Sequence, residues 1–545
     1  MILKSSFNEE LQMSDAVDEN QQGIAKDQAN SSTARGGEGV GGGLLVITGA
    51  KLWFMVGGAL ISFGLPYLFN WAGRDGAALY GQYSDINNTL SILSMMIITG
   101  GLQAVSKWTS QYAGDLDRAQ GAVWQLWWFM VLIGIVVGGG FSLAAPWIAE
   151  ARGVAELTPA YQAAGGVLAA YSLYVVFIGA LNGRRQFTSQ ALYDIGFTTL
   201  KVLCILGAVG LGFGVTGAFT GFSIAATLIM ILAWIKVGLG PQGAPSPWRQ
   251  VYGYAAQVMA YTLIFNLIFK VDLLMLKPAA HQLLGGGEDQ LIGIYNLALQ
   301  VSRLPWQVTI AVTFVIFPLL SEATFSQDDT RSKLYVRQTL RYMLILAGAA
   351  SAGLLALPQT VTALFPESYA EMSIALRWTA PAYLCFTLFN LCNTLLMSAG
   401  RALSAFVIGS LTVLCTIAAY WFMLYHGEMK SGSMSSGELL STAGQVALSS
   451  FALGLSMGLF RLRQLFGASL PLWTGFRVLC ASTVLWGIGQ QVTSSNRIVL
   501  LATLAGLGIL FFIILLLLGE WSREERASLI QGLQRRLGRS GSTAE

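Results

Sequence analysis

The chain has 545 residues, of which 54% are hydrophobic and 11% charged, and its formal net charge is +4. Soluble domains carry about 25% charged residues, so this composition excludes an ordinary water-soluble protein. The small net charge gives no reason to expect a nucleic-acid partner. The five cysteines lie in apolar segments and form no CxxC pair, so we expect neither a metal site nor a cofactor. They are Cys204, Cys385, Cys392, Cys415 and Cys480.

The first 43 residues are polar, with Ser, Gln, Asn, Asp and Gly dominating. This composition predicts a disordered tail, and it lacks the apolar core of a signal peptide. A helix needs about 20 apolar residues to cross the hydrocarbon core of a bilayer. Such segments predict an all-α polytopic membrane protein with about fourteen transmembrane helices. The predicted spans are 52–71, 86–106, 122–148, 161–181, 191–213, 216–237, 251–276, 291–319, 340–357, 374–397, 402–425, 439–460, 473–491 and 498–519.

The spans fall into two blocks of six and a final pair. A Pro- and Gly-rich segment, GLGPQGAPSPWRQ, separates the two blocks. We therefore expect six consecutive units. They are a disordered tail over 1–43, an N-lobe over 44–237, a cytoplasmic linker over 238–250, a C-lobe over 251–460, helices 13 and 14 within 461–519, and a basic cytoplasmic tail over 520–545.

The basic residues predict the orientation of the chain. On the side of the N-terminus lie 23 of the 32 Lys and Arg residues, whereas the opposite loops hold six. The other three lie deep within spans: Lys201, Lys270 and Arg303. Cytoplasmic loops are enriched in Lys and Arg, so we expect both termini in the cytoplasm.

Two short repeats connect the first block of helices with the second. LYGQY at 79–83 resembles LIGIY at 291–295, at an offset of 212 residues. LNGRRQF at 181–187 resembles MSAGRAL at 397–403, at an offset of 217 residues. The offset spans six helices, so the two copies share one orientation. This predicts two six-helix lobes related by an axis along the membrane normal, which is a transporter architecture.

Two longer segments carry a family resemblance. The run GAALYGQYSDINNTLSILSMMIITGGLQAVSKWTSQYAGD begins at residue 76, and KVDLLMLK followed by IGIYNLALQVSRLPWQVTIAVTFVIFPLLSEA lies within 270–323. Both resemble the oligosaccharide-lipid flippases of the multidrug/oligosaccharidyl-lipid/polysaccharide exporter superfamily. The resemblance implies a two-lobed alternating-access carrier in the bacterial cytoplasmic membrane. Its flippase members move undecaprenyl-diphosphate-linked glycans to the outer leaflet.

The resemblance leaves the substrate open. Fourteen helices resemble the lipid II flippases more than the twelve-helix drug extruders. Lipid II flippases, however, carry arginines in their first two helices, and this chain has none in either segment. By the same resemblance, helices 13 and 14 either form a groove for a polyprenyl tail or simply face lipid.

The eighth span carries the main candidate site. Asn296, Gln300, Arg303 and Gln307 recur at helical spacing and share one face. Such a face should line a cavity rather than meet lipid, and an arginine there can bind phosphate through its planar fork. The alternative is a structural arginine satisfied by neighbouring carboxylates or carbonyl groups.

Other polar residues within spans are further candidates. Asp272 is predicted to pair with Arg303 and to release it during coupling or gating, and Lys270 is a second candidate for binding the diphosphate. Asp194 and Lys201 share a helix face and form a second candidate coupling pair. The proposed glycan contacts are Asn88, Ser91 and Asn390. Structural ion pairs and helix–helix contacts are the alternatives for all of these residues.

The sequence thus predicts a flippase, not an enzyme, for a lipid-linked oligosaccharide in surface polysaccharide synthesis. Its partners would be the glycan substrate, membrane lipids, a polysaccharide polymerase and glycosyltransferases. No Walker motif occurs, so the chain itself should not hydrolyse ATP. The alternatives are a cation-coupled drug extruder, a lipid II flippase and a membrane-embedded glycosyltransferase; the short outer loops disfavour the last.

Overall fold

The computed structural model describes residues 40–71, 75–112, 114–307, 328–423, 434–491 and 497–521, with a few single residues between 316 and 326. The predicted tails over 1–43 and 520–545 lie almost wholly outside this part of the chain. Every regular element within it is a helix, which confirms the predicted all-α class. The main helices are α2 (Val40–Trp71), α3 (Gly76–Gln111), α4 (Leu116–Ile133), α5 (Gly140–Ala151), α6 (Thr158–Gly183), α7 (Phe187–Gly210), α8 (Gly214–Val237), α9 (Trp248–Leu267), α10 (Val271–Leu284), α11 (Glu288–Ser302), α13 (Asp329–Ala356), α14 (Pro358–Thr362), α15 (Met372–Ser398), α16 (Ala402–Tyr420), α17 (Ser436–Phe466), α18 (Leu472–Gly489) and α19 (Arg497–Leu517).

The described helices confirm a multi-pass membrane protein. Twelve of them are long and apolar enough to cross a bilayer, and the bent pair α9 and α10 brings the number to 13. The long third span is continuous, because a π-helical turn at Gly134–Gly139 joins α4 to α5. The closely spaced fifth and sixth spans are separate helices, α7 and α8, joined by a turn in which Gly212 and Gly214 have positive φ. The predicted span 291–319 is described as a helix only in its first half.

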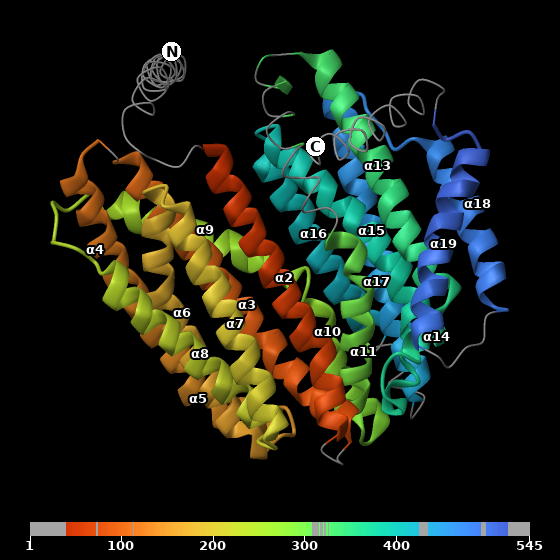
Figure 1. The fold of residues 1–545 in the computed structure, drawn as a ribbon, viewed down its shortest axis with the longest axis horizontal. Helices are drawn as coiled ribbons and strands as arrows, with labels where there is room; N and C mark the ends of the chain where they lie inside the picture. The colour runs from red at the N-terminus through yellow and green to blue at the C-terminus, as the bar shows by residue number, and fades with distance from the viewer. Residues whose placement is uncertain are drawn as a thin grey trace, which may run out of the picture.

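The helices form two groups that lie side by side (Figure 1). In the N-terminal group, α2 to α9, helix α6 packs on α3 and α8, and α2 packs on α7. In the C-terminal group, α10 to α19, helix α15 packs on α17 and α13 packs on α18. We call the face where α2 begins and α19 ends the terminal face, and the face where α2 meets α3 the distal face; the distal face is at the bottom of Figure 1.

The two groups touch where the sequence repeat begins. A Cβ atom on Gly81 would overlap the carbonyl oxygen of Asp289, and a Cβ on Gly293 would overlap that of Ala77. Gly81 and Gly293 are 212 residues apart, as are Ala77 and Asp289. Exchanging the repeats therefore exchanges the two contacts, as expected if a two-fold pseudo-axis passes between α3 and α11. The glycines are needed because small residues allow helix backbones to approach closely.

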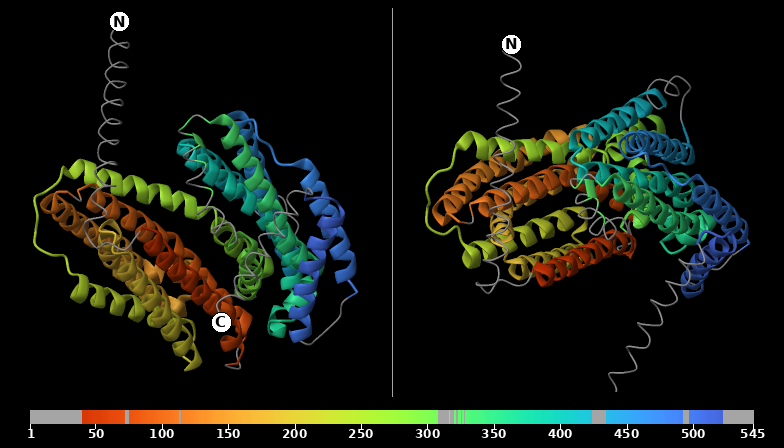
Figure 2. Two further views of the ribbon diagram at one scale, coloured as in Figure 1. Left: turned by 45° about the horizontal axis from the view of Figure 1, so that its top comes forward. Right: turned by 90° about the horizontal axis from the view of Figure 1, so that it is seen from above.

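The predicted linker is held against the N-terminal group. Residue Gln125 on α4 donates to the Ser246 carbonyl at 2.8 Å and accepts from the Ser246 amide at 3.1 Å. Gly121 on α4 has no room for a Cβ, because the carbonyl of Ala244 lies against it. Figure 2 shows the segment following the outer edge of this group before α9 begins. Helix α9 then packs on α3 and α4, so it lies with the N-terminal group.

The predicted span 251–276 corresponds in the structure to two helices separated by a break. Helix α9 ends at Leu267, α10 begins at Val271, and their axes differ by 52°. Helix α10 packs mainly on α11 and α16 of the C-terminal group. The sequence showed no proline at this break, so the bend follows from the two halves packing against different groups.

The last two helices are fixed by a buried carboxylate after α19. Glu520 accepts from Arg341 on α13 at 2.7 Å, and from Arg477 and Thr474 on α18 at 2.9 and 2.7 Å. Burial raises the pKa of the Glu520 carboxyl, but the hydrogen bonds from the two arginines outweigh burial and hold this pKa below its ordinary value. The contacts join both final helices to α13.

The helix crossing makes a stability prediction. We expect Gly81→Ala and Gly293→Ala each to lower the free energy of unfolding by about 1–3 kcal/mol, because the added methyl group meets backbone atoms. Gly58→Ala is the matched control, since a Cβ there has nothing within 4 Å. Thermal unfolding of the purified protein in detergent measures the difference. Equal stability of Gly293→Ala and Gly58→Ala would contradict the close crossing.

Candidate functional site

At the break between α9 and α10, two predicted site residues donate to backbone carbonyl groups, of which the Lys270 carbonyl also accepts from the Leu274 amide at 3.2 Å. Asn88 on α3 donates to the Lys270 carbonyl at 3.1 Å. Arg303, which directly follows α11, donates through Nη2 to the Phe269 carbonyl at 3.0 Å. Hydrocarbon offers no water to such groups, so protein donors must satisfy them. One donor comes from each group of helices, and the break is therefore held from both sides.

Arg303 is buried among aromatic rings and neutral acceptors. It is 8% exposed, and its Nε donates to the Tyr383 hydroxyl at 2.7 Å. Its guanidinium also lies over the Tyr383 ring, 5.4 Å from the centroid. Phe269 packs between the rings of Phe386 and Trp306, at centroid distances of 4.8 and 5.3 Å. The contacts with Tyr383 hold the Arg303 side chain, and the ring contacts hold the Phe269 side chain, at the bend.

Three ionisable side chains lie beside the break. Asp272 is buried and lies within electrostatic reach of Arg303 and Lys270, but it forms no ion pair within 4 Å with any residue that the structure describes. Its Oδ1 instead accepts from the Leu273 amide at 2.9 Å. The predicted direct pair of Asp272 and Arg303 is therefore absent from this structure. Lys270 and Arg303 are thus the basic residues beside the break, and Asp272 is the acid.

The polar face predicted on the eighth span is divided. Asn296 is buried and donates to Ser84 at 2.8 Å and to Tyr80 at 3.3 Å, so it joins α11 to α3. Gln300 is half-buried and makes no hydrogen bond with another described side chain. Gln307 is also half-buried and is the last residue before a gap in the described chain. On this face, Asn296 and Arg303 thus have protein partners, whereas Gln300 has none among the described side chains.

The two other predicted glycan contacts differ in their surroundings. Ser91 donates to the Asn88 carbonyl of its own helix at 2.9 Å. Asn390 on α15 is half-buried, and its side chain makes no hydrogen bond with another described residue. Asn390 therefore keeps its hydrogen-bonding capacity, whereas the Ser91 hydroxyl is used locally.

The predicted pair of Asp194 and Lys201 does not form in this structure. Asp194 forms an ion pair with Lys51 on α2 at 2.8 Å, where Lys51 is 47% exposed. Lys201 points to aromatic rings instead, with its Nζ 4.7 Å from the centroid of Phe222. Helix spacing places the two residues on one face, but the neighbouring helix α2 supplies the closer cation.

A buried ionic cluster on the distal face was missed from the sequence. Asp85 on α3 binds Arg152 at 2.7 Å and Lys277 on α10 at 3.1 Å. Lys277 also binds Asp289 on α11 at 2.9 Å, and Tyr161 donates to Asp85 at 3.2 Å. The prediction placed Asp85 just outside the span 86–106 and the other three charges in loops. An acid beside an apolar helix was the signal that could have revealed the cluster.

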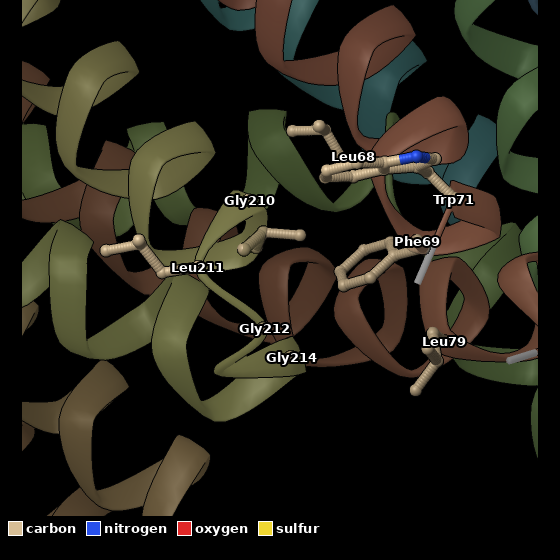
Figure 3. A pocket seen from close by; sticks show the side chains of 9 residues that line it. Leu68, Phe69, Trp71, Leu79, Gly210, Leu211, Gly212 and Gly214 are labelled. Carbon is tan, nitrogen blue, oxygen red and sulfur yellow. The ribbon is translucent and has the colours of Figure 1, made fainter. Parts of the chain in front are cut away.

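A separate surface cavity of about 380 Å³ opens near the distal ends of α2, α3 and α7. Leu68, Phe69 and Trp71 line one side, and the turn at Leu211 lines the other (Figure 3). Its lining side chains are mostly apolar, with the indole of Trp71 among them, and none is a predicted site residue. None of the nine lining residues is charged.

The contact between Arg303 and Tyr383 predicts a stability effect. Tyr383→Phe removes one of the two acceptors of a buried cation, which should lower the free energy of unfolding by about 1.5–3 kcal/mol. Tyr261→Phe is the matched control, because the Tyr261 hydroxyl donates only to the Met397 sulfur, a weak acceptor. Thermal unfolding compares the two variants. Indistinguishable losses would show that the Tyr383 hydroxyl does not stabilise Arg303.

Known proteins are similar to this chain in sequence and in fold. An uncharacterized membrane protein of Bacillus subtilis (strain 168), YabM, is 24% identical over 485 residues, covering 82% of this chain and 88% of that protein. The fold is similar to that of the lipid II flippase MurJ in an inward closed conformation, with a TM-score of 0.60 and 12% identity over 82% of this chain and 98% of that chain. It is also similar to an inward-facing multidrug resistance MATE family transporter of the MOP superfamily, with a TM-score of 0.59 and 15% identity over 77% of this chain and 99% of that chain.

The family match is more specific than the likeness of folds. Residues 80–375, which contain the helix crossing, the break and the ionic cluster, match the family described as "Polysaccharide biosynthesis protein". This confirms the predicted resemblance to the flippases of polysaccharide synthesis and their superfamily. Because the match covers more than half of its length, the chain belongs to the polysaccharide biosynthesis protein family.

Proposed function

We propose that the protein is a flippase that moves a diphosphate-linked oligosaccharide lipid across the bacterial cytoplasmic membrane by alternating access. One observation carries the proposal. Arg303 is a buried cation whose direct partners are a carbonyl and a phenol, and no described carboxylate lies within 4 Å of it. Buried charges within membranes are costly and are usually compensated, so this site favours an anionic ligand.

A diphosphate would compete with the helix break for Arg303. The guanidinium offers five donors in a planar fork, and two of its groups already point to the Phe269 carbonyl and the Tyr383 hydroxyl. Charge-assisted bonds to phosphate are stronger than bonds to a neutral carbonyl. Binding would therefore draw Arg303 from the break and leave the Phe269 carbonyl free for a helical amide. Ligand binding and straightening of α9 and α10 would thus be coupled.

Other residues of the site offer groups that suit a glycan, and the distribution of basic residues supports the proposed orientation in the membrane. Gln300, Gln307 and Asn390 offer amide groups suited to sugar hydroxyls, and Lys270 adds positive charge beside Arg303. The excess of Lys and Arg on the side of the termini supports a cytoplasmic terminal face. The substrate would then come from cytoplasmic glycosyltransferases and pass to a polymerase on the other side.

Substitution of Arg303 tests the proposal. We expect Arg303→Gln to lower transport about tenfold or more, because losing a charge-assisted hydrogen bond costs about 1.5–3 kcal/mol. Arg303→Lys should retain part of the activity, since it keeps the charge without the planar fork. Transport is measured as surface polysaccharide in cells and as protection of labelled lipid-linked glycan in vesicles. Arg377→Gln, an exposed arginine on α15, is the control.

The outcomes separate the proposal from its rivals. Unchanged transport by Arg303→Gln at normal protein level would remove Arg303 from the site. Normal surface polysaccharide in a deletion strain, with increased sensitivity to cationic drugs, would favour a cation-coupled drug extruder. Arrested peptidoglycan synthesis would instead favour a lipid II flippase.

A further inference from the structure

The ionic cluster on the distal face spans the contact between the two groups of helices. Asp85 and Arg152 belong to the N-terminal group, whereas Lys277 and Asp289 belong to the C-terminal group. Asp85 and Lys277 are each 2% exposed. Their ion pair at 3.1 Å therefore joins the groups in a place that water does not reach. Gln82 on α3 adds a second crossing contact by donating to Asp289 at 3.0 Å.

The charges divide evenly between the two groups. Within the N-terminal group, Asp85 keeps Arg152 at 2.7 Å, and Tyr161 donates to the same carboxylate. Within the C-terminal group, Lys277 keeps Asp289 at 2.9 Å. If the groups part here, the pair of Lys277 and Asp85 is the only ion pair among the described residues that breaks. Each group then retains one acid and one base and is locally neutral.

This division matters because isolated buried charges are expensive. Removing one partner of a buried pair leaves an uncompensated ion, whereas separating two neutral pairs does not. The helices beneath the cluster cross closely at Gly81 and Gly293. Beside the crossing, the Tyr369 hydroxyl donates to the Gly76 carbonyl at 3.1 Å, and the Tyr369 ring packs edge-on against Tyr80 with centroids 6.2 Å apart. Opening must therefore part this hydrogen bond and this ring contact as well as the ion pair.

The geometry points to a reversible ionic gate on the distal face, formed by Asp85, Arg152, Lys277 and Asp289, which opens by breaking one ion pair while each group stays neutral. Lys277 is its central residue, because it alone binds an acid on each side. The gate rests on the proposed function in one respect, that the two groups separate during a transport cycle. It makes no demand on the identity of the substrate.

Spin-label distances across the distal face test the gate without substrate. Nitroxide labels are placed at Glu156→Cys and Gln282→Cys, both exposed, in full-length protein whose five native cysteines are replaced. We expect Lys277→Gln to raise the ratio of open to closed protein about tenfold or more, because Asp289 and Asp85 then share the closed contact without the lysine. The double variant Lys277→Gln with Asp289→Asn leaves no excess acid. It should raise the ratio less than Lys277→Gln does, because no unpaired acid is left in the closed contact.

Two further variants serve as a second test and as a control. Asp85→Asn with Arg152→Gln removes the other neutral pair and should also raise the ratio about two- to fivefold; it replaces Lys277→Gln if that variant does not fold. Arg118→Gln breaks the exposed pair with Asp115 near the terminal face and should leave the distances unchanged. Wild-type distances in both double variants would overturn the gate. A gate effect alongside wild-type glycan transport in Arg303→Gln would refute the proposed site but retain the gate.

Discussion

The absence of water in the hydrocarbon core is the constraint on which the centre of this structure depends. A transmembrane helix can break only where other groups satisfy the carbonyls that the break exposes. Here the break lies at residues 268–270, and its donors are Asn88 and Arg303. The need to satisfy the Phe269 carbonyl therefore places the guanidinium of Arg303 at the break, and Asn88 on α3 adds a second bond to the Lys270 carbonyl. The same requirement brings the positive charge of Arg303 into a buried position.

The break also explains how one predicted span serves both groups of helices. Helix α9 is tied to the N-terminal group through the docked linker and its packing on α3 and α4. Helix α10 packs on α11 and α16. The two groups are thus joined by a covalent bend rather than by a free loop. A relative motion of the groups must change this bend, and any change in the bend must change the partners of Arg303.

The second connection between the groups has a different chemistry. On the distal face, α3 and α11 meet through paired glycines, buried hydrogen bonds and a neutral ionic cluster. Ion pairs and hydrogen bonds depend on close approach and are lost over short distances, whereas large apolar interfaces resist separation. The hydrogen bonds at the bend and the ion pair on the distal face are therefore the parts of these contacts most sensitive to a small separation, while buried rings add apolar contact at both places.

The sequence by itself determined the membrane class, the order and approximate positions of the helices and the repeat, because these depend on local apolar length and spacing. Helices α3 and α13, however, begin ten and eleven residues before the predicted spans 86–106 and 340–357. It also identified Arg303 and Asn88, since polar residues within spans are costly wherever they lie. Only the tertiary structure decided which partners they have. Asp194 pairs with Lys51 rather than sharing a site with Lys201, Asp272 does not bind Arg303 directly, and Asp85 meets Lys277 across the distal contact. Periodicity assigns a residue to a face of its own helix, but the packing of two groups of helices decides which residue of another helix meets that face.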